Sequence, residues 1–181
     1  MIYTLIIVIL VTIYFVVTYN TLIKLNNSVK EAFSTLDVYL KKRWDLIPNI
    51  VETVKGYAKH EKETLQSVVG LRSGDYSSLS PEEKIEANKN LDKSMSNFQI
   101  LVENYPELKA DKNYLELSSS LTNIENEISQ SRKYYNAVVK EYNNKTSMFP
   151  SNIVAGIFGF SEKPMFEASE NEREAVKVKL W

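Results

Sequence analysis

The chain has 181 residues, with 22 Lys and Arg against 23 Asp and Glu, so its formal net charge of −1 gives no general attraction to nucleic acid. It contains no cysteine, which excludes disulfides, thiol chemistry and zinc–thiolate sites. Five Gly and five Pro residues are few for this length and favour long helices.

The first 19 residues are one apolar run without a charged residue, Gly or Pro. A helix of about 19 residues spans roughly 28 Å, which matches the ~30 Å hydrocarbon core of a bilayer. A buried core helix would show a polar stripe, and a signal peptide would show a basic start and a small-residue cleavage site. The run shows none of these, so residues 1–19 are predicted to be an uncleaved transmembrane anchor whose partner is the lipid bilayer.

Charge on the two sides of this anchor predicts its orientation. No Lys or Arg precedes the run, whereas Lys24 and Lys30 follow it closely. Cytoplasmic flanks carry the excess of basic residues. We therefore expect the amino end outside and the main domain in the cytoplasm.

Beyond Tyr19, apolar residues recur at steps of three and four, which predicts an amphipathic helix that continues from the anchor. Pro48 interrupts this pattern and leaves two alternatives. In the first, one long helix only kinks at Pro48. In the second, Asp45 is the N-cap of a new antiparallel helix with Pro48 in its first turn.

Start and stop signals predict two further helices. Ser80, followed by Pro and by Glu83, is a capping box that starts a helix ending at Pro106. Asp111 is the expected cap of the next helix, which we place over 112–147.

The carboxyl end has two parts. An apolar stretch with two Gly residues covers 151–160, and a charged stretch without periodicity, predicted to be a mobile tail, covers 161–181. Met165, Phe166 and Trp181 are potential anchors within that tail. The predicted organisation is a transmembrane anchor (1–19), a helical bundle domain (20–149), an apolar Gly-containing segment (150–160) and a charged flexible tail (161–181).

No constellation for catalysis, metal binding or cofactor binding is found. His60 is the single histidine, and position 64, where a zincin motif needs its second His, is Thr64. We therefore predict no catalytic, cofactor-binding or metal residues, and no enzyme. Within the basic cluster at 41–43, Arg43 is predicted to be a structural partner of a carboxylate such as Asp45.

Tyrosine is followed by asparagine at three places, in Tyr19-Asn20, Tyr135-Asn136 and Tyr142-Asn143. A buried Tyr ring needs a hydrogen-bond partner for its hydroxyl, so these pairs predict packing between helices with fixed hydrogen bonds. An aromatic ligand-binding box is the alternative.

Four blocks of the sequence resemble the LemA family of bacterial single-pass membrane proteins. The most specific runs from Leu36 to Glu61 and contains Asp-Leu-Ile-Pro-Asn, which ends at Asn49. The other three follow in the same order as in the family, at 103–111, 131–143 and 148–160.

The resemblance implies an all-α fold in which the anchor continues into an antiparallel up-and-down bundle of four helices, with three long helices as the alternative. It favours a break at Pro48 and a location in the bacterial inner membrane. It supplies no catalytic residues, and its relatives in magnetosome membranes suggest a part in membrane organisation.

The up-and-down arrangement makes a geometric prediction. The last helix would run back towards the anchor, so residues 149–160 would lie at the bilayer surface with Phe149, Phe158 and Phe160 facing it. Phe158 would then lie near Tyr19, whereas in the three-helix alternative it would be tens of ångströms away.

Together these observations predict a non-enzymatic, membrane-anchored scaffold or adaptor that organises or recruits proteins, including further copies of itself. A small-molecule or lipid-binding membrane sensor is the alternative. The interaction candidates are Arg43, Asp45, Pro48, Asn49, Tyr135, Asn136, Tyr142, Asn143, Phe149, Phe158 and Phe160.

Overall fold

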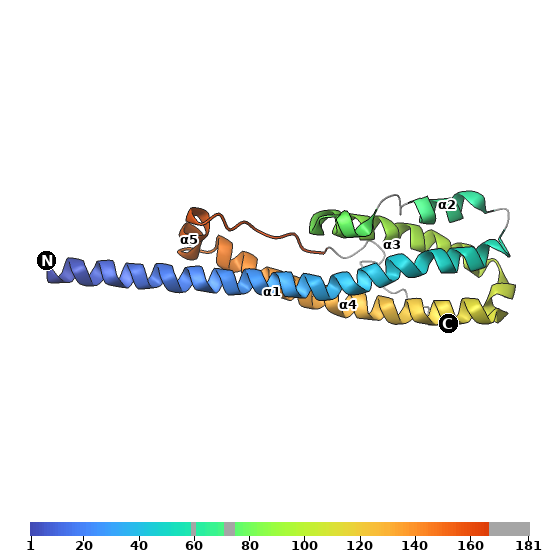
Figure 1. Cartoon of the computed structure of the whole chain (residues 1–181), viewed down its shortest axis with the longest axis horizontal. Helices are drawn as coiled ribbons and strands as arrows, with labels where there is room; N and C mark the ends of the chain where they lie inside the picture. The colour runs from blue at the N-terminus through green and yellow to red at the C-terminus, as the bar shows by residue number, and fades with distance from the viewer. Residues whose placement is uncertain (59–60, 71–74, 167–181) are drawn as a thin grey trace, which may run out of the picture. The chain divides into compact units, whose positions relative to one another are not determined.

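The structure is a computed structural model that describes residues 1–58, 61–70 and 75–166. Regular structure in these ranges is entirely helical, which confirms the predicted all-α class (Figure 1). The α-helices are α1 (Ile2–Lys55), α2 (Lys62–Gly70), α3 (Pro81–Glu103), α4 (Lys112–Ser147) and α5 (Ser151–Ile157), with short 3-10 helices at Tyr76–Ser78 and Pro106–Ala110.

The chain divides into two compact units. The first, here called the anchor unit, contains Met1–Asp37 and Ser129–Met165. The second, here called the bundle unit, contains the described residues of Val38–Ile128 together with Phe166. Helices α1 and α4 each contribute to both units, whereas α2 and α3 belong to the bundle unit and α5 to the anchor unit.

The first part of α1 is apolar, and its side chains are exposed. Within the described ranges, α1 alone is long and apolar enough to cross a bilayer, and only 6% of its most apolar 18-residue window is buried. The hydroxyls of Thr4 and Thr12 donate to the carbonyls of Met1 and Val8, at 2.6 and 2.9 Å. Such internal hydrogen bonds suit a helix whose side chains face lipid, because lipid offers no partners.

Helix α1 does not break at Pro48. It continues through this residue to Lys55, so the second helix expected from an N-cap at Asp45 does not exist. The physical reason lies in the buried face, where Ile47, Val51 and Val54 keep the helical phase on both sides of the proline. Their burial offsets the roughly 3 kcal/mol that an interior proline costs.

The predicted starts of α3 and α4 are confirmed. The Ser80 hydroxyl accepts from the Glu83 amide at 3.2 Å, and the Glu83 carboxylate accepts from the Ser80 amide at 2.7 Å. This bond to the Ser80 backbone lowers the pKa of Glu83. The Asp111 carboxylate accepts from the amide of Tyr114 at 2.8 Å, and α4 then spans the predicted 112–147.

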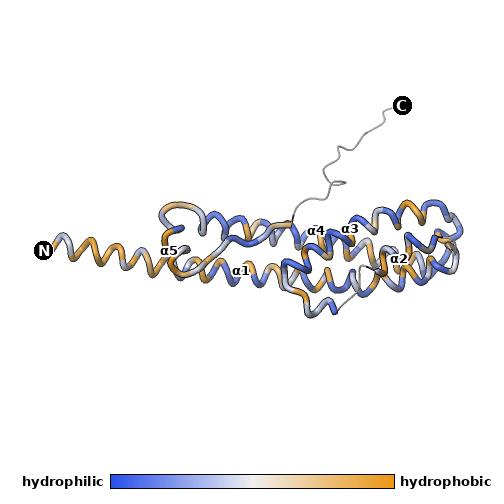
Figure 2. Tube along the Cα trace, turned by 90° about the horizontal axis from the view of Figure 1, so that it is seen from above, coloured by the Kyte–Doolittle hydropathy of each residue, from blue (hydrophilic) through white to orange (hydrophobic). Residues whose placement is uncertain are grey.

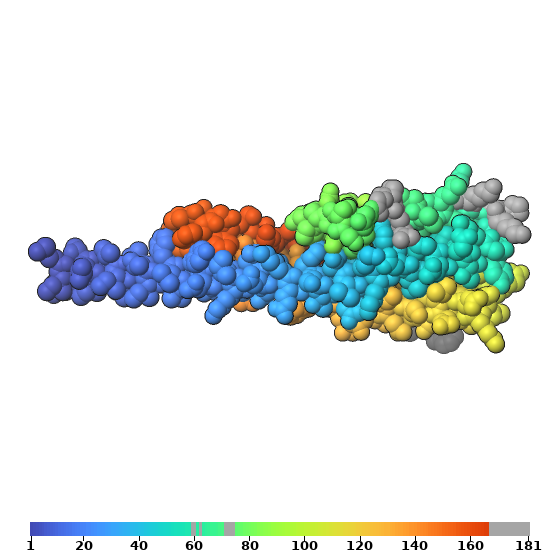
Figure 3. Space-filling model, in the orientation of Figure 1, coloured from blue at the N-terminus to red at the C-terminus, as the bar shows by residue number. Residues whose placement is uncertain are grey.

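Helix α5 packs against α1 inside the anchor unit. Leu22, Val154 and Ala155 form its buried core, with Phe15, Tyr19 and Phe160 packed around them. The ring centroids of Tyr19 and Phe158 lie 4.6 Å apart, as the up-and-down arrangement predicts. On the face shown in Figure 3, α5 lies on α1, and the part of α1 nearer the amino end is uncovered.

The turn after α5 is a Schellman motif. The amide of Phe160 donates to the Ala155 carbonyl at 2.9 Å, and that of Gly159 to the Gly156 carbonyl at 3.4 Å. Gly159 has a φ of +72°, a conformation that favours glycine. The motif reverses the chain and directs residues 160–165 back along α4.

Candidate functional site: an arginine network and the groove beside it

The central polar feature of the bundle unit is Arg43, whose side chain is only 1% exposed. Leu36, Leu40, Trp44 and Ile47 mark the buried face of α1, and Arg43 falls between them at helical spacing. Burying a charged residue on such a face is costly unless its charge is paired.

Three side chains from two other helices receive the guanidinium. Nη1 donates to Asp92 at 2.6 Å and to both oxygens of Glu125 at 3.1 and 3.2 Å. Nη2 donates to the Asn88 side-chain oxygen at 2.6 Å. Asn88 and Asp92 lie one turn apart on α3, and Glu125 lies on α4. Arg43 therefore connects α1, α3 and α4.

Asn88 is fully buried and completes the network. Its amide nitrogen donates to the Lys84 carbonyl at 2.8 Å and to the Tyr76 hydroxyl at 3.4 Å. The Tyr76 ring packs on Trp44, with centroids 5.1 Å apart, and Lys84 Nζ lies 5.0 Å from the Tyr76 ring centre.

The network keeps the guanidinium charged. Burial acts against the charged form, but the carboxylates of Glu125 and Asp92 outweigh burial, so the pKa of Arg43 is raised. Arg43 therefore acts as a fixed positive charge and not as an acid or base.

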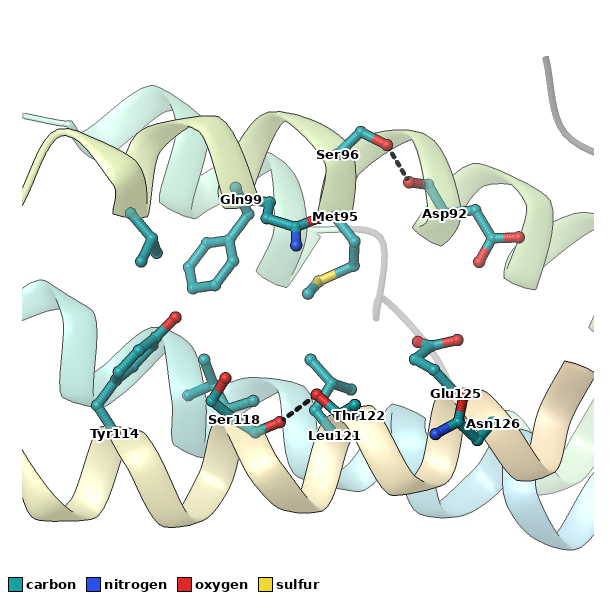
Figure 4. A pocket seen from close by; sticks show the side chains of 13 residues that line it. Asp92, Met95, Ser96, Gln99, Tyr114, Ser118, Leu121, Thr122, Glu125 and Asn126 are labelled. Atoms are coloured by element: carbon teal, nitrogen blue, oxygen red, sulfur yellow. Dashed lines mark hydrogen bonds between the residues drawn. The ribbon is translucent and has the colours of Figure 1, made fainter. Parts of the chain in front are cut away.

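A groove lies beside this network, between α3 and α4, with a cavity volume of about 390 Å³. Figure 4 shows Asp92 and Glu125 facing each other at one end, Met95 and Leu121 in the middle, and Tyr114 at the other end. Among the described residues that line it, two are acidic and none is basic. The lining residues are Ile50, Asp92, Met95, Ser96, Phe98, Gln99, Val102, Tyr114, Ser118, Leu121, Thr122, Glu125 and Asn126.

The groove has an apolar floor and a polar rim. Ile50, Phe98 and Val102 are buried side chains of the floor. On the rim, the hydroxyls of Ser96 and Thr122 donate to their own helices, at 3.2 and 2.9 Å. Such a surface can hold an apolar side chain below and polar or cationic groups at its edge.

Arg43 is a structural partner of carboxylates, as predicted, but Asp45 is not one of them. Asp45 pairs with Lys41, on the exposed surface, while Arg43 turns to Asp92 and Glu125. Residues two apart on a helix point to different faces, so Asp45 cannot follow Arg43 into the core. Asn49 is likewise exposed on α1, and Pro48 is half-buried.

The Tyr-Asn pairs of α4 confirm the predicted packing between helices at Tyr135, whose ring contacts Phe33 of α1, but their hydrogen bonds go elsewhere. Tyr135 donates to the Pro164 carbonyl at 2.9 Å, and Asn143 exchanges two hydrogen bonds of 2.9 Å with the Lys163 backbone. These hydrogen bonds join α4 to the extended segment after α5. Burial raises the pKa of Tyr142, partly opposed by a hydrogen bond with Thr146, and Asn136 is half-buried.

Residues 161–165, assigned to the tail from sequence, are thus held along α4 in the anchor unit. His60 and residues 167–181, including Trp181, lie outside the described residues. Phe149 and Phe158 are 80% and 52% exposed, and Phe160 is half-buried.

Asn88, Asp92 and Glu125 were not identified from the sequence as partners of Arg43. The positions of Asn88 and Glu125 nevertheless carry a signal. Asn88 lies three residues after Ile85 and three before Leu91, on the apolar stripe of α3. Glu125 lies four residues after Leu121 and three before Ile128, on the stripe of α4. A polar residue at a stripe position indicates a buried partner on another helix.

These features define a class of protein: an all-α bundle that carries one exposed apolar helix at its amino end. The chain belongs to the LemA family, whose profile matches residues 32–180. It is 30% identical over 158 residues to Protein LemA of Metamycoplasma hominis, an alignment that covers 85% of this chain and 71% of that protein.

Two further relatives are Magnetosome protein MamQ 2 and Magnetosome protein MamQ 1 of Paramagnetospirillum magneticum. Each is 22% identical to this chain over 177 residues, which is 82% of this chain and 64% of the relative. The chain therefore spans less than two thirds of either protein. Family and relatives indicate a membrane-associated bacterial protein, and none of these names denotes an enzyme.

Proposed function

We propose that the chain is a non-enzymatic, membrane-anchored scaffold that holds a partner protein in the groove between α3 and α4. The observation that carries this proposal is the groove itself, with its apolar floor and its pair of carboxylates at one end. Membership of a membrane-associated family supports the anchored part of the proposal.

The lining points to the chemistry of the partner. Met95, Phe98 and Leu121 offer contacts to an apolar side chain. Asp92 and Glu125 share the single positive charge of Arg43, so this end of the groove keeps one net negative charge that attracts a cation. A cavity of about 390 Å³ admits a few side chains and not a whole helix. The partner we propose is a short amphipathic segment of another protein, with a Lys or Arg beside a large apolar residue.

The proposal places the anchor in the bacterial inner membrane with the bundle unit in the cytoplasm, as Lys24 and Lys30 predict. Protease added to spheroplasts would then leave the bundle unit intact, and would cleave it only after lysis. Cleavage in intact spheroplasts would contradict this orientation.

Site-specific photo-crosslinking tests the groove in the full chain. A photo-reactive residue at Gln99, which lines the groove, should crosslink to one defined peptide of another protein. The same residue at Asn97, exposed on α3 outside the lining, should not crosslink to that peptide. Equal labelling at both positions, or a crosslinked peptide from a second copy of this chain, would contradict the proposal.

A binding measurement with the purified components completes the test. The crosslinked peptide, once synthesised, should bind the full chain in nanodiscs, and Thr122→Trp should fill the groove and weaken binding roughly tenfold. Asn123→Trp, one residue further on and outside the lining, is the matched control and should leave the affinity unchanged.

The cavity volume favours a second candidate, a small-molecule sensor, because ligand pockets range from roughly 300 to 1,000 Å³. Native mass spectrometry of the full chain released from membranes distinguishes the two. A bound molecule that Thr122→Trp removes would favour the sensor, and a clean mass together with peptide binding would favour the scaffold.

A further inference from the structure

The anchor unit has a second apolar surface, at its carboxyl-terminal end. Residues 148–158, the turn before α5 together with α5 and its cap, are here called the interfacial segment. Five of its apolar side chains are between 48% and 80% exposed, namely Met148, Phe149, Ile153, Ile157 and Phe158. Exposed apolar side chains that cluster in this way mark a site of contact with a membrane or another molecule.

The place on α1 where α5 packs indicates what covers these exposed side chains. Phe15, Tyr19 and Leu22 of α1 hold α5, through Val154, Ala155 and Phe160. The stretch from Ile2 to Tyr19 rises about 26 Å, so residues 15–22 reach the end of a ~30 Å hydrocarbon core. In Figure 2, α5 lies beside α1 where its hydrophobic part gives way to a mixed pattern.

The exposed and buried residues of α5 lie on different faces. Ser151, Val154 and Ala155 face α1, whereas Ile153 and Ile157 point away from it. The Schellman turn at Gly159 then returns the chain along α4. The exposed apolar side chains of the segment therefore lie beside the apolar stretch of α1, where Phe158 contacts Tyr19.

We propose that the interfacial segment inserts into the boundary between headgroups and acyl chains and forms a second membrane contact beside the transmembrane helix. Amphipathic helices bury their apolar face about 5–10 Å deep in this zone, and aromatic rings are enriched there. The contact between Tyr19 and Phe158, with ring centroids 4.6 Å apart, would fix the segment at this depth. The proposal does not depend on the groove or on the identity of its occupant.

The absence of cysteine makes a depth measurement direct. Ile153→Cys and Ile157→Cys, each labelled with an environment-sensitive fluorophore, place probes on the exposed face of α5 in the full chain. Ala137→Cys is the control, exposed on α4 near the level where Phe33 packs on Tyr135, with ring centroids 5.7 Å apart. Phe33 is 14 residues beyond Tyr19, about 21 Å along α1.

The chains are reconstituted in vesicles of phosphatidylcholine and phosphatidylglycerol, with a nitroxide attached to the lipid near its carbonyl groups. We expect blue-shifted emission and roughly halved fluorescence at positions 153 and 157, and neither effect at position 137. Emission at 153 and 157 like that at 137 would overturn the proposal. A blue shift without quenching would also overturn it, because a protein would then cover the segment.

A second measurement avoids labels on α5. Paramagnetic lipids should broaden the NMR signals of the Ile153 and Ile157 methyl groups in the otherwise native chain in nanodiscs, and leave the Val139 methyl groups unaffected, since Val139 is buried on α4. Equal broadening at the three residues, or none, would contradict the proposal even if the labelled variants failed to fold.

Discussion

Arg43 is a charged residue at a position where the periodicity of α1 predicts an apolar side chain. Its three partners come from two helices, and no two of the partners are adjacent in sequence. A buried ion pair of this kind adds little net stability compared with apolar packing. It penalises any register in which Arg43 loses its carboxylates, so we infer that the network selects one alignment of α1, α3 and α4.

Replacing Arg43 by Met should destabilise the chain by about 3 kcal/mol. The variant leaves the side-chain oxygen of the fully buried Asn88 without its donor and takes the cation from Asp92 and Glu125. Urea unfolding in nanodiscs, followed by circular dichroism, measures the change. Asp45→Asn removes the exposed pair with Lys41 and should cost less than about 0.5 kcal/mol. Equal effects of the two variants would show that the network is not structural.

Two glycines near α5 should respond in opposite directions to the same substitution. Gly159→Ala forces a non-glycine residue to a φ of +72° and should destabilise the turn by about 1 kcal/mol. Gly156→Ala lies inside α5 with no atom within 4 Å of the added carbon, and should stabilise the helix by about 0.5–1 kcal/mol. Exchange of the Phe160 amide hydrogen, bonded to Ala155, reports both changes. If both substitutions accelerated this exchange, or both slowed it, the opposite roles given to Gly156 and Gly159 would be contradicted.

At the scale of elements, the proline in α1 and the proline of α3 form a natural comparison. Pro48→Ala restores an amide in a helix interior and should stabilise the chain by about 1–3 kcal/mol. Pro81→Ala acts at the first position of α3, where proline is favourable, and should give no gain. The urea midpoints of the two variants, compared with that of the unsubstituted chain, measure these changes in stability. A loss of helix content in Pro48→Ala would be evidence against continuity of α1.

The elements that were predicted correctly depend on local signals. The capping box at Ser80 and the cap at Asp111 are formed by residues within three positions of each other, so the sequence contains both halves of each motif. Continuity through Pro48 depends instead on burial of Ile47 and Val51 by other parts of the chain. The partners of Arg43 lie 45 to 82 residues away, and helical periodicity alone cannot pair them.

The junction between the end of α1 and the start of α4 should be sensitive to acid. The Tyr114 amide and the Tyr57 hydroxyl, which donates at 2.9 Å, lower the pKa of Asp111 below its ordinary 3.8. A carboxyl whose pKa is lower in the folded state stabilises that state above its unfolded pKa, and the effect is lost as pH falls through the folded value.

Comparison with Asp111→Asn isolates this contribution. The wild-type chain should lose its stability advantage over the variant as the pH falls below about 4, as measured by urea unfolding at a series of acidic pH values. Glu107→Gln, an exposed carboxyl in the same 3-10 helix region, is the control and should follow the wild-type curve. A constant difference between wild type and Asp111→Asn at all pH values would exclude the titration of Asp111 as its cause.

At the scale of the whole molecule, the two units divide the features described above. The anchor unit contains the apolar stretch of α1, α5 and the segment held by Asn143, whereas the bundle unit contains Arg43 and the groove. The composition of the sequence predicted the apolar stretch of α1, whereas it assigned the segment held by Asn143 to the tail. The groove could not be predicted, because α1, α3 and α4 supply its residues jointly and no single helix contains enough of them to indicate a groove.

Membrane insertion of the whole chain should depend on the total apolarity of residues 1–19 and not on any single residue. About twelve strongly apolar residues contribute roughly −4 to −7 kcal/mol, and each arginine near the centre costs about 3 kcal/mol. Val8→Arg alone should therefore remain inserted. Val8→Arg combined with Val11→Arg, on the same face, should cancel most of the driving force and appear in the soluble fraction after carbonate extraction.

Val8→Leu with Val11→Leu is the matched control and should stay in the membrane. Both valines are more than half exposed, so the double arginine variant removes no packing within the chain and should keep its helical circular dichroism signal. Loss of that signal would mean that residues 1–19 are packed inside a protein core. Retention of the double arginine variant in the membrane pellet would show that a contact other than α1, such as the interfacial segment, is sufficient for attachment.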